Sequence, residues 1–212
     1  MSSLEQLFQK NGFNCIAGVD EVGRGPLAGP VVACAVIFLQ NSPIFESSEI
    51  RDSKALAPKK REERYWEILK QVRVGIGVVS EKEIDEINIL RASLLAMRKA
   101  VLALSSTPDV ILIDGLHDLD RLPMEQVAIV EGDRKSISIA SASIVAKVTR
   151  DKMMEQYDEA FPQYGFAKHK GYPTAEHLAA LDQYGLSPIH RRSFGPVAKL
   201  NRESREYVKH AH

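Results

Sequence analysis

The sequence predicts an α/β fold: a mixed five-stranded sheet with helices on both faces and a helical C-terminal extension. Two apolar runs, residues 15–20 and 31–39, lie on either side of a short glycine-rich turn, which predicts an antiparallel pair of strands. Between residues 58 and 131, segments with helical periodicity alternate with short apolar runs, as in a sheet covered by helices. Beyond residue 138 the pattern is helical. We therefore expect a core domain over 1–160 and a helical extension over 161–212.

Each expected element has a local reason. Pro58 suits the first turn of a helix that continues as a charged amphipathic segment. Residues 109–114 are apolar between two aspartates, which is typical of a parallel strand buried on both faces. The small side chains of residues 139–147 let a helix lie close against a sheet. In chain order, the expected elements are helix 4–10, strands 15–20 and 31–39, a polar loop over 41–57, helix 59–72, strand 72–79, helix 81–104 with a break near Asn88, strands 109–114 and 126–131, helix 138–161, and helical segments 174–183 and 197–208.

Composition narrows the class of protein. The chain has 212 residues, of which 44% are hydrophobic, enough for a normal core. Lys plus Arg and Asp plus Glu number 28 each, so affinity for nucleic acid must come from local clusters of charge. The first residues lack the features of a signal peptide and no run approaches membrane-spanning length, so a cytoplasmic protein without membrane contact is expected. Cys15 and Cys34 show no metal or redox spacing and are expected as reduced, buried side chains.

The turn between the first two strands carries the strongest functional signal. The first strand ends in Asp20 and Glu21, and two charges at a poorly solvated strand end are costly unless a cation or hydrogen-bond donors compensate them. Gly23 and Gly25 allow close approach of backbone amides to a ligand, and Arg24 between them can reach phosphate or sugar oxygens. The alternative, two solvated acids at a strand end, does not explain that loop. A Rossmann or P-loop motif is excluded, because the spacing is G-x-G-x-x-x-G and a strand follows.

Carboxylates recur at the ends of other predicted strands. Asp114 ends strand 109–114, and Asp133 follows strand 126–131. Ligands of such sheets gather outside the carboxyl ends of strands, so we expect these acids to converge with Asp20 and Glu21. Oxygen ligands select hard cations, and a pair of Mg²⁺ or Mn²⁺ ions supports phosphodiester hydrolysis. One condition applies: neighbouring strand residues point to opposite faces, so Asp20 and Glu21 share a site only if the strand ends or bends between them.

Other polar residues carry weaker signals. The six histidines show no paired helical spacing with an acid and are expected at the surface or as caps, with His190 as the one candidate for a substrate contact. Ser141 and Ser143 have no base nearby in sequence, so a serine nucleophile is not expected. Tyr172, on a basic loop, either stacks on a sugar or base or pins the loop to the core. The basic candidates for nucleic-acid contact are Arg24 and Lys54, which we favour, and Lys135, Lys147, Lys168, Lys170, Arg191 and Arg192.

Seven motifs in the same chain resemble bacterial ribonuclease HII, the type 2 ribonuclease H. They cover nearly the whole chain in the order of that family, with no departure at a catalytic position. The matching segments are GVDEVGRGPLAGP at 18–30, DSK at 52–54, IDG at 113–115, GD at 132–133, ASIVAKVTRD at 142–151, KGYPT at 170–174 and RSFGP at 192–196.

The resemblance implies a ribonuclease H-like fold. It also implies endonucleolytic cleavage of RNA in RNA–DNA hybrids and 5′ of ribonucleotides embedded in duplex DNA, leaving 3′-hydroxyl and 5′-phosphate ends, as in ribonucleotide and primer removal. It assigns two Mn²⁺ or Mg²⁺ ions to the four acids at positions 20, 21, 114 and 133. The Gly23-Arg24-Gly25 backbone would sense the ribose 2′-hydroxyl, and Tyr172 would pack on the deoxyribose that follows. Lys54 is a further expected substrate contact. The protein is expected to act as a monomer.

Two rival functions remain open at the level of sequence. A nuclease of the same fold could cut another substrate, as a junction resolvase or transposase-like enzyme does. A catalytically silent nucleic-acid-binding module could keep the fold, but it would need a broken acidic set, and none of the four positions is broken.

Overall fold

The structure is a computed structural model that describes residues 4–39 and 57–200. Its elements follow the predicted order closely, including the break between two helices at Asn88. The strands are β1 (Ile16–Val22), β2 (Val31–Phe38), β3 (Val72–Val79), β4 (Val110–Asp114) and β5 (Glu125–Ile129). The helices are α1 (Leu4–Lys10), α2 (Pro58–Leu69), α3 (Glu81–Ile87), α4 (Ile89–Leu102), α5 (Gly132–Lys135), α6 (Ile137–Ala160), α7 (Phe166–His169) and α8 (Ala175–Tyr184), with a 3₁₀ turn η4 (Pro162–Tyr164).

The five strands form one mixed sheet, as predicted, and their order is β3-β2-β1-β4-β5. β1 pairs antiparallel with β2 and parallel with β4, and β4 pairs parallel with β5. The first strand was expected to end at Asp20, but β1 continues to Val22 because Glu21 and Val22 still pair with Ala33 and Val32. The strand that carries the first two acids therefore lies at the centre of the sheet.

Contacts group the described residues into two units. We call them the sheet unit, which comprises Met1–Val22, Val32–Val78 and Ser93–Thr149, and the loop unit, which comprises Gly23–Val31, Val79–Ala92 and the chain from Arg150 onward. The helices α4 and α6 each contribute residues to both. The division expected from the sequence, 1–160 and 161–212, stays a prediction, since residues 201–212 lie outside the described part.

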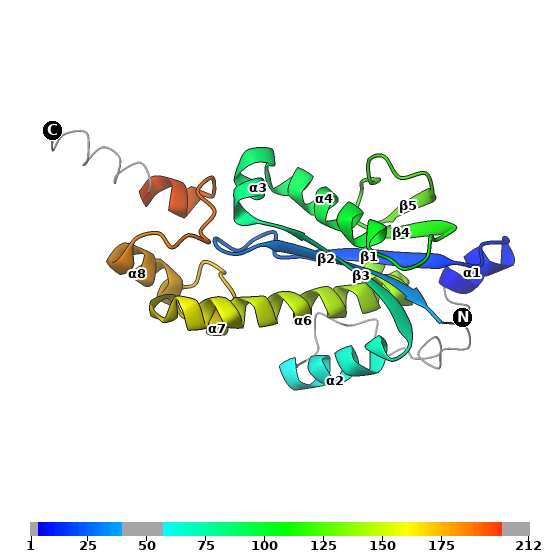
Figure 1. Ribbon diagram of the computed structural model, residues 1–212, viewed down its shortest axis with the longest axis horizontal. Helices are drawn as coiled ribbons and strands as arrows, with labels where there is room; N and C mark the ends of the chain where they lie inside the picture. Colours follow the sequence, from blue (N-terminus) through cyan, green and yellow to red (C-terminus); the bar gives the residue numbers. More distant parts are fainter. Residues whose placement is uncertain (1–3, 40–56, 201–212) are drawn as a thin grey trace. The chain divides into compact units, whose positions relative to one another are not determined.

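The sheet unit buries both faces of its strands. Figure 1 shows α4 on one face of the sheet and α6 with α2 on the other. The predicted close approach of the small-residue helix occurs at Gly18, where a Cβ atom would meet the backbone at Ser138 and Ile139. Gly75 and Gly77 play the same part on β3, since a Cβ at either position would strike the backbone of α4. These glycines let the helices lie directly on the strands.

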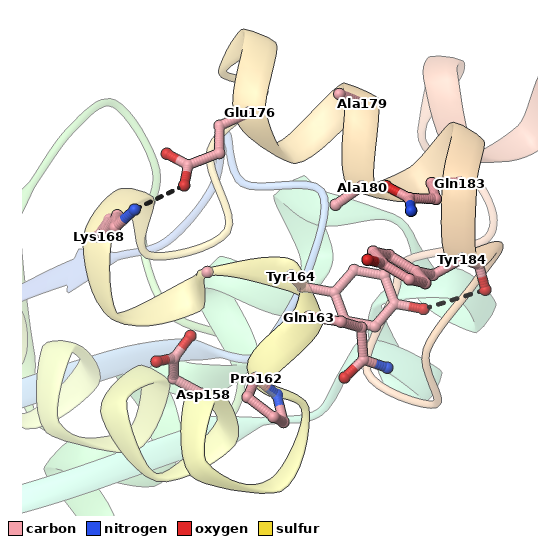
Figure 2. A pocket seen from close by; sticks show the side chains of 11 residues that line it. Asp158, Pro162, Gln163, Tyr164, Lys168, Glu176, Ala179, Ala180, Gln183 and Tyr184 are labelled. Atoms are coloured by element: carbon pink, nitrogen blue, oxygen red, sulfur yellow. Dashed lines mark hydrogen bonds and ion pairs between the residues drawn. The ribbon is translucent and has the colours of Figure 1, made fainter.

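The loop unit has a separate aromatic core. Tyr164 and Phe166 stack with ring centroids 5.3 Å apart, and Met154 and Ile189 are buried in the same cluster. Beside this core lies an open pocket of about 370 Å³ lined in part by Tyr164 and Tyr184 (Figure 2). The Tyr164 hydroxyl donates to the carbonyl of Gly185 at 3.0 Å.

Three histidines of the loop unit contradict the expectation that they lie at the surface or act as caps. His169, His177 and His190 are 9%, 0% and 2% exposed. The Nε2 atoms of His177 and His190 lie 3.0 Å apart, and burial lowers the pKa of His190 to about 4, with the charge of His177 lowering it further. His169 stacks on His177 and has backbone hydrogen-bond partners at Tyr164 and Gly171, so all three imidazoles have hydrogen-bond partners in the interior. His190 is too buried to contact a substrate.

Several expectations fall at the limits of the described residues. The residues at 195–200 are helical, which agrees with the start of the last predicted segment. Lys54 and the predicted loop as far as residue 56 lie outside the described residues.

Cys34 is buried as expected, whereas Cys15 is only partly buried. Across residues 4–39 and 57–200, no helix has both the length and the apolar character needed to cross a membrane.

Candidate active site

Two predicted acids lie side by side at the carboxyl ends of adjacent strands. β1 and β4 run parallel, and the last pair in register is Val19 with Ile113, so Asp20 and Asp114 each follow a paired position. Paired strands are about 4.8 Å apart and residues in register share a face, which places both carboxylates on one side of the sheet. Cys34, opposite Asp20 on β2, lies on that side too: burial, and then the charge of Asp20, raises its pKa well above the usual value.

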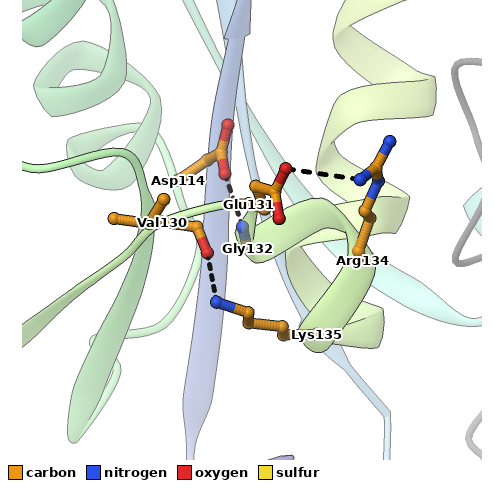
Figure 3. Close-up of polar contacts among 6 residues, drawn as sticks. All are labelled: Asp114, Val130, Glu131, Gly132, Arg134 and Lys135. Atoms are coloured by element: carbon orange, nitrogen blue, oxygen red, sulfur yellow. Dashed lines mark hydrogen bonds and ion pairs between the residues drawn. The ribbon is translucent and has the colours of Figure 1, made fainter.

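The third acid is brought to Asp114 by the turn after β5. The amide of Gly132 donates to Asp114 Oδ1 at 2.7 Å, and Gly132 opens the short helix α5 (Figure 3). Glu131, before it, has a left-handed backbone with φ of 52°, which turns the chain sharply back toward β4. Asp133 is the next residue after Gly132 and is 5% exposed. The turn after β5 therefore brings the chain next to Asp133 against the carboxylate of Asp114.

Glu21 does not satisfy the condition stated from the sequence. β1 neither ends nor breaks its pairing between Asp20 and Glu21, so the two side chains leave the strand on opposite faces. Glu21 is half-buried, and its amide donates to Asp20 Oδ1 at 2.7 Å. The contact that holds Glu21 to Asp20 is made by its backbone.

The chemistry of this donor set fits a hard divalent cation. Carboxylate oxygens are the ligands that Mg²⁺ and Mn²⁺ prefer. Two of the four acids, Asp20 and Asp133, are 3% and 5% exposed. As oriented, Asp20 Oδ1 and Asp114 Oδ1 accept from backbone amides. In the part of the chain that the structure describes, no three His, Cys, Asp or Glu side chains are grouped closely enough to hold an ion. The backbone places the acids together, and holding an ion requires the side chains to turn.

The glycine turn after β1 belongs to the loop unit. Gly23 has φ of 96°, and a Cβ there would strike the Arg150 side chain, so glycine is required at this position. The amide of Leu27 donates to Gly171 O and that of Arg191 to Leu27 O, both at 2.8 Å, which joins the turn to two later segments. Arg191 was a candidate for nucleic-acid contact, but it is fully buried and hydrogen-bonds to this turn instead.

Tyr172 lies at the surface of the same unit. It is 41% exposed, and a Cβ built on Gly25 would be 3.5 Å from its Cε1, which is ordinary contact distance. Its carbonyl lies 2.9 Å from Nδ1 of the buried His177. The backbone therefore fixes the loop, and the ring is left accessible next to the exposed Arg24 and Gly25.

Three of the predicted basic contacts, Lys135, Lys168 and Lys170, interact with other groups of the chain. Lys168 forms an ion pair with Glu176 at 2.8 Å, visible in Figure 2, and Lys170 pairs with Glu155 at 2.7 Å. Lys135 donates to the carbonyl of Val130 at 2.6 Å (Figure 3). These lysines balance local charge or cap a turn, so the positive charge nearest the glycine turn is that of arginines.

Comparison with known proteins identifies the family. The model of the ribonuclease HII family matches residues 17–197 of this chain. The chain is 53% identical over 200 residues to ribonuclease HII of Bacillus subtilis (strain 168), covering 93% of this chain and 76% of that protein. It is 52% identical to ribonuclease HII of Acholeplasma laidlawii (strain PG-8A), covering 93% and 96%. The crystal structure of ribonuclease H2 from Pyrococcus horikoshii OT3 has a TM-score of 0.76 with 28% identity over 91% of this chain and 99% of that one, which confirms the ribonuclease H-like fold. The chain belongs to the ribonuclease HII family.

Proposed function

We propose that this protein is a metal-dependent ribonuclease H that hydrolyses the RNA strand of RNA–DNA hybrids and cuts duplex DNA 5′ of an embedded ribonucleotide. The observation that supports the proposal is that Asp20 and Asp114 follow the last paired residues of the parallel strands β1 and β4, in a chain that belongs to the ribonuclease HII family. The products would carry 3′-hydroxyl and 5′-phosphate ends.

The acids would hold the metal. We assign Asp20, Glu21, Asp114 and Asp133 to two divalent ions, Mn²⁺ or Mg²⁺. Because the Glu21 side chain leaves β1 on the opposite face, its carboxylate would join the other acids only if the strand bends between Asp20 and Glu21. Such ions, when bound, activate a water and stabilise the charge on a phosphodiester. The chain's own contribution is to position two of the carboxylates: the Gly132 amide orients Asp114, and the Glu21 amide orients Asp20.

The loop unit would recognise the substrate. We assign the backbone at Gly23, Arg24 and Gly25 to the 2′-hydroxyl of the ribonucleotide, and the exposed ring of Tyr172 to the following deoxyribose. The contact of Tyr172 with Gly25 supports one shared surface for the two neighbouring sugars. Lys54 and the segment 161–212 are assigned to substrate binding as well.

One assay tests the proposal. Three labelled substrates of one sequence are compared, each with and without EDTA: an RNA–DNA hybrid, a duplex with a single ribonucleotide, and its all-DNA twin. We expect metal-dependent cleavage of the first two and no cleavage of the third. Equal cleavage of the all-DNA twin would point to a nuclease of the same fold with another substrate. Binding without any cleavage would point to a silent binding module.

We also propose that the protein acts as a monomer in the cytoplasm, because its relatives are bacterial proteins and the proposed substrates arise where bacterial DNA is copied. Light scattering of the purified protein should give a mass near 23.6 kDa. A mass twice as large would contradict the monomer.

A further inference from the structure

Two arginines are fully buried beneath the glycine turn. Arg150 and Arg191 are both 0% exposed and are among the largest buried side chains of the described residues. Both belong to the loop unit. Burial lowers the pKa of Arg150 to about 10 and that of Arg191 to about 9, so both are charged at neutral pH. Burying two like charges is costly unless their donors are well used.

Arg191 donates hydrogen bonds to backbone carbonyls of the turn itself. Its Nη2 donates to Gly23 O at 2.6 Å, its Nη1 to Arg24 O at 3.1 Å, and its Nε to Gly29 O at 2.9 Å. All three acceptors are main-chain carbonyls separated from Arg191 by more than 160 residues of sequence. The guanidinium thus fixes the orientation of consecutive peptide groups at the turn.

Arg150 holds the other end of the turn and ties it to a second loop. Its Nε donates to Pro30 O at 2.9 Å and its Nη2 to Ala28 O at 3.1 Å. Its Nη1 donates to Lys170 O at 2.9 Å, two residues before Tyr172. Arg150 therefore links the glycine turn to the loop that carries Tyr172.

The geometry of the peptide group determines where the backbone amides of the turn point. In a trans peptide group the carbonyl and the following amide point in opposite directions, and the described residues contain no cis peptide bond. Because the carbonyls of Gly23 and Arg24 point at the Arg191 guanidinium, the amides of Arg24 and Gly25 point away from it. Arg24 and Gly25 are the exposed residues of the turn, so those amides face outward.

We propose that Arg191 and Arg150 are positioning residues for ribonucleotide recognition: Arg191 aims the Arg24 and Gly25 amides at the substrate sugar, and Arg150 holds the Tyr172 loop at a fixed distance from them. Lysine cannot replace either, since one ammonium cannot reach three carbonyls in a planar fork. This inference rests on the proposed function.

The test measures binding discrimination rather than turnover. The full-length protein is titrated, with Ca²⁺ present, with a duplex that contains one ribonucleotide and with its all-DNA twin. The dissociation constant for the all-DNA twin is divided by that for the ribonucleotide duplex, and this ratio is compared among variants. For Arg191→Lys, which keeps the charge, we expect the ratio to fall by about tenfold or more, as for loss of hydrogen bonds to a charged group, while affinity for the all-DNA twin changes little. Tyr164→Phe serves as the control, because it removes a hydrogen bond of the same unit without touching the turn.

The outcomes separate the inference from the proposed function. If the wild-type protein binds both duplexes equally, the proposed substrate is wrong. If the wild type discriminates and a folded Arg191→Lys discriminates equally well, the positioning role is wrong. Should the variant not fold, NMR of the wild type decides: the Arg24 and Gly25 amide signals must shift more with the ribonucleotide duplex than with its twin. Equal shifts would overturn the inference.

Discussion

Replacing Asp114 with Asn tests the acidic site with little disturbance of the fold. Asn keeps an oxygen that can accept from the Gly132 amide, which now donates at 2.7 Å. Only the charge assistance is lost, and we estimate the cost at about 1 kcal/mol, the difference between a charged and a neutral hydrogen bond. For a chain of this size that corresponds to a fall in Tm of about 2–4 °C. Relief of repulsion among the acids acts in the opposite direction.

The expected effect on turnover is much larger. Loss of one ligand charge should lower kcat by roughly 10²–10³-fold, comparable to removing one preorganised group that stabilises a transition state. Single-turnover cleavage of the ribonucleotide duplex measures this, and calorimetry measures Tm. Asp109→Asn is a matched control at the other end of β4, where Asp109 Oδ2 accepts from the amides of Asn14 and Cys15 at 2.8 Å. It should lower Tm comparably and leave kcat unchanged. Wild-type turnover in Asp114→Asn would remove that residue from the site.

Three further predictions concern the rest of the chain. Tyr172→Ala should weaken cleavage at an isolated ribonucleotide by about tenfold or more with little change in Tm, since Tyr172 is 41% exposed. If activity and Tm fall together, the tyrosine instead holds its loop to the core. Burial lowers the pKa of His190 from 6.5 to about 4, so the unfolded chain takes up this proton first and stability should fall as pH drops from about 6.5 to about 4. His190→Gln should make Tm less dependent on pH over that interval, and an unchanged slope would contradict the assignment. Gly18→Ala should destabilise the protein by about 1–3 kcal/mol in denaturant unfolding, because a Cβ there meets helix backbone, whereas Gly195→Ala, with open space around it, should be nearly neutral.

Local patterns in the sequence determined most of the fold. The alternation of apolar runs with glycine and proline predicted five strands, and the continuous apolar run before Asp114 predicted a buried parallel strand, as observed. β4 ends at Asp114, as local polarity predicted, and Asp20 follows the last residue of β1 that pairs with β4, so these two acids could be placed near the carboxyl ends of adjacent strands without coordinates. The family motifs then supplied the substrate, which no local pattern encodes.

The fate of individual polar side chains was decided only by the tertiary structure. The predicted end of β1 at Asp20 was wrong because pairing with β2, not local composition, carries the strand to Val22 and turns Glu21 to the other face. Glu5, unremarkable in sequence, is fully buried, and its Oε1 accepts from Ser136 Oγ at 2.6 Å, 131 residues away. Arg191, one of the weaker candidates for nucleic-acid contact, instead lies buried beneath the glycine turn.

The physical reason is common to these cases. Periodicity records which face of an element is apolar, and it is read over a few neighbouring residues. Whether a charged or polar group can be buried depends on donors and acceptors that distant segments bring to it, as the carbonyls of the glycine turn are brought to two arginines. The sequence by itself therefore determined the sheet and the strand positions of Asp20 and Asp114, and only the tertiary structure decided which polar groups became part of the interior.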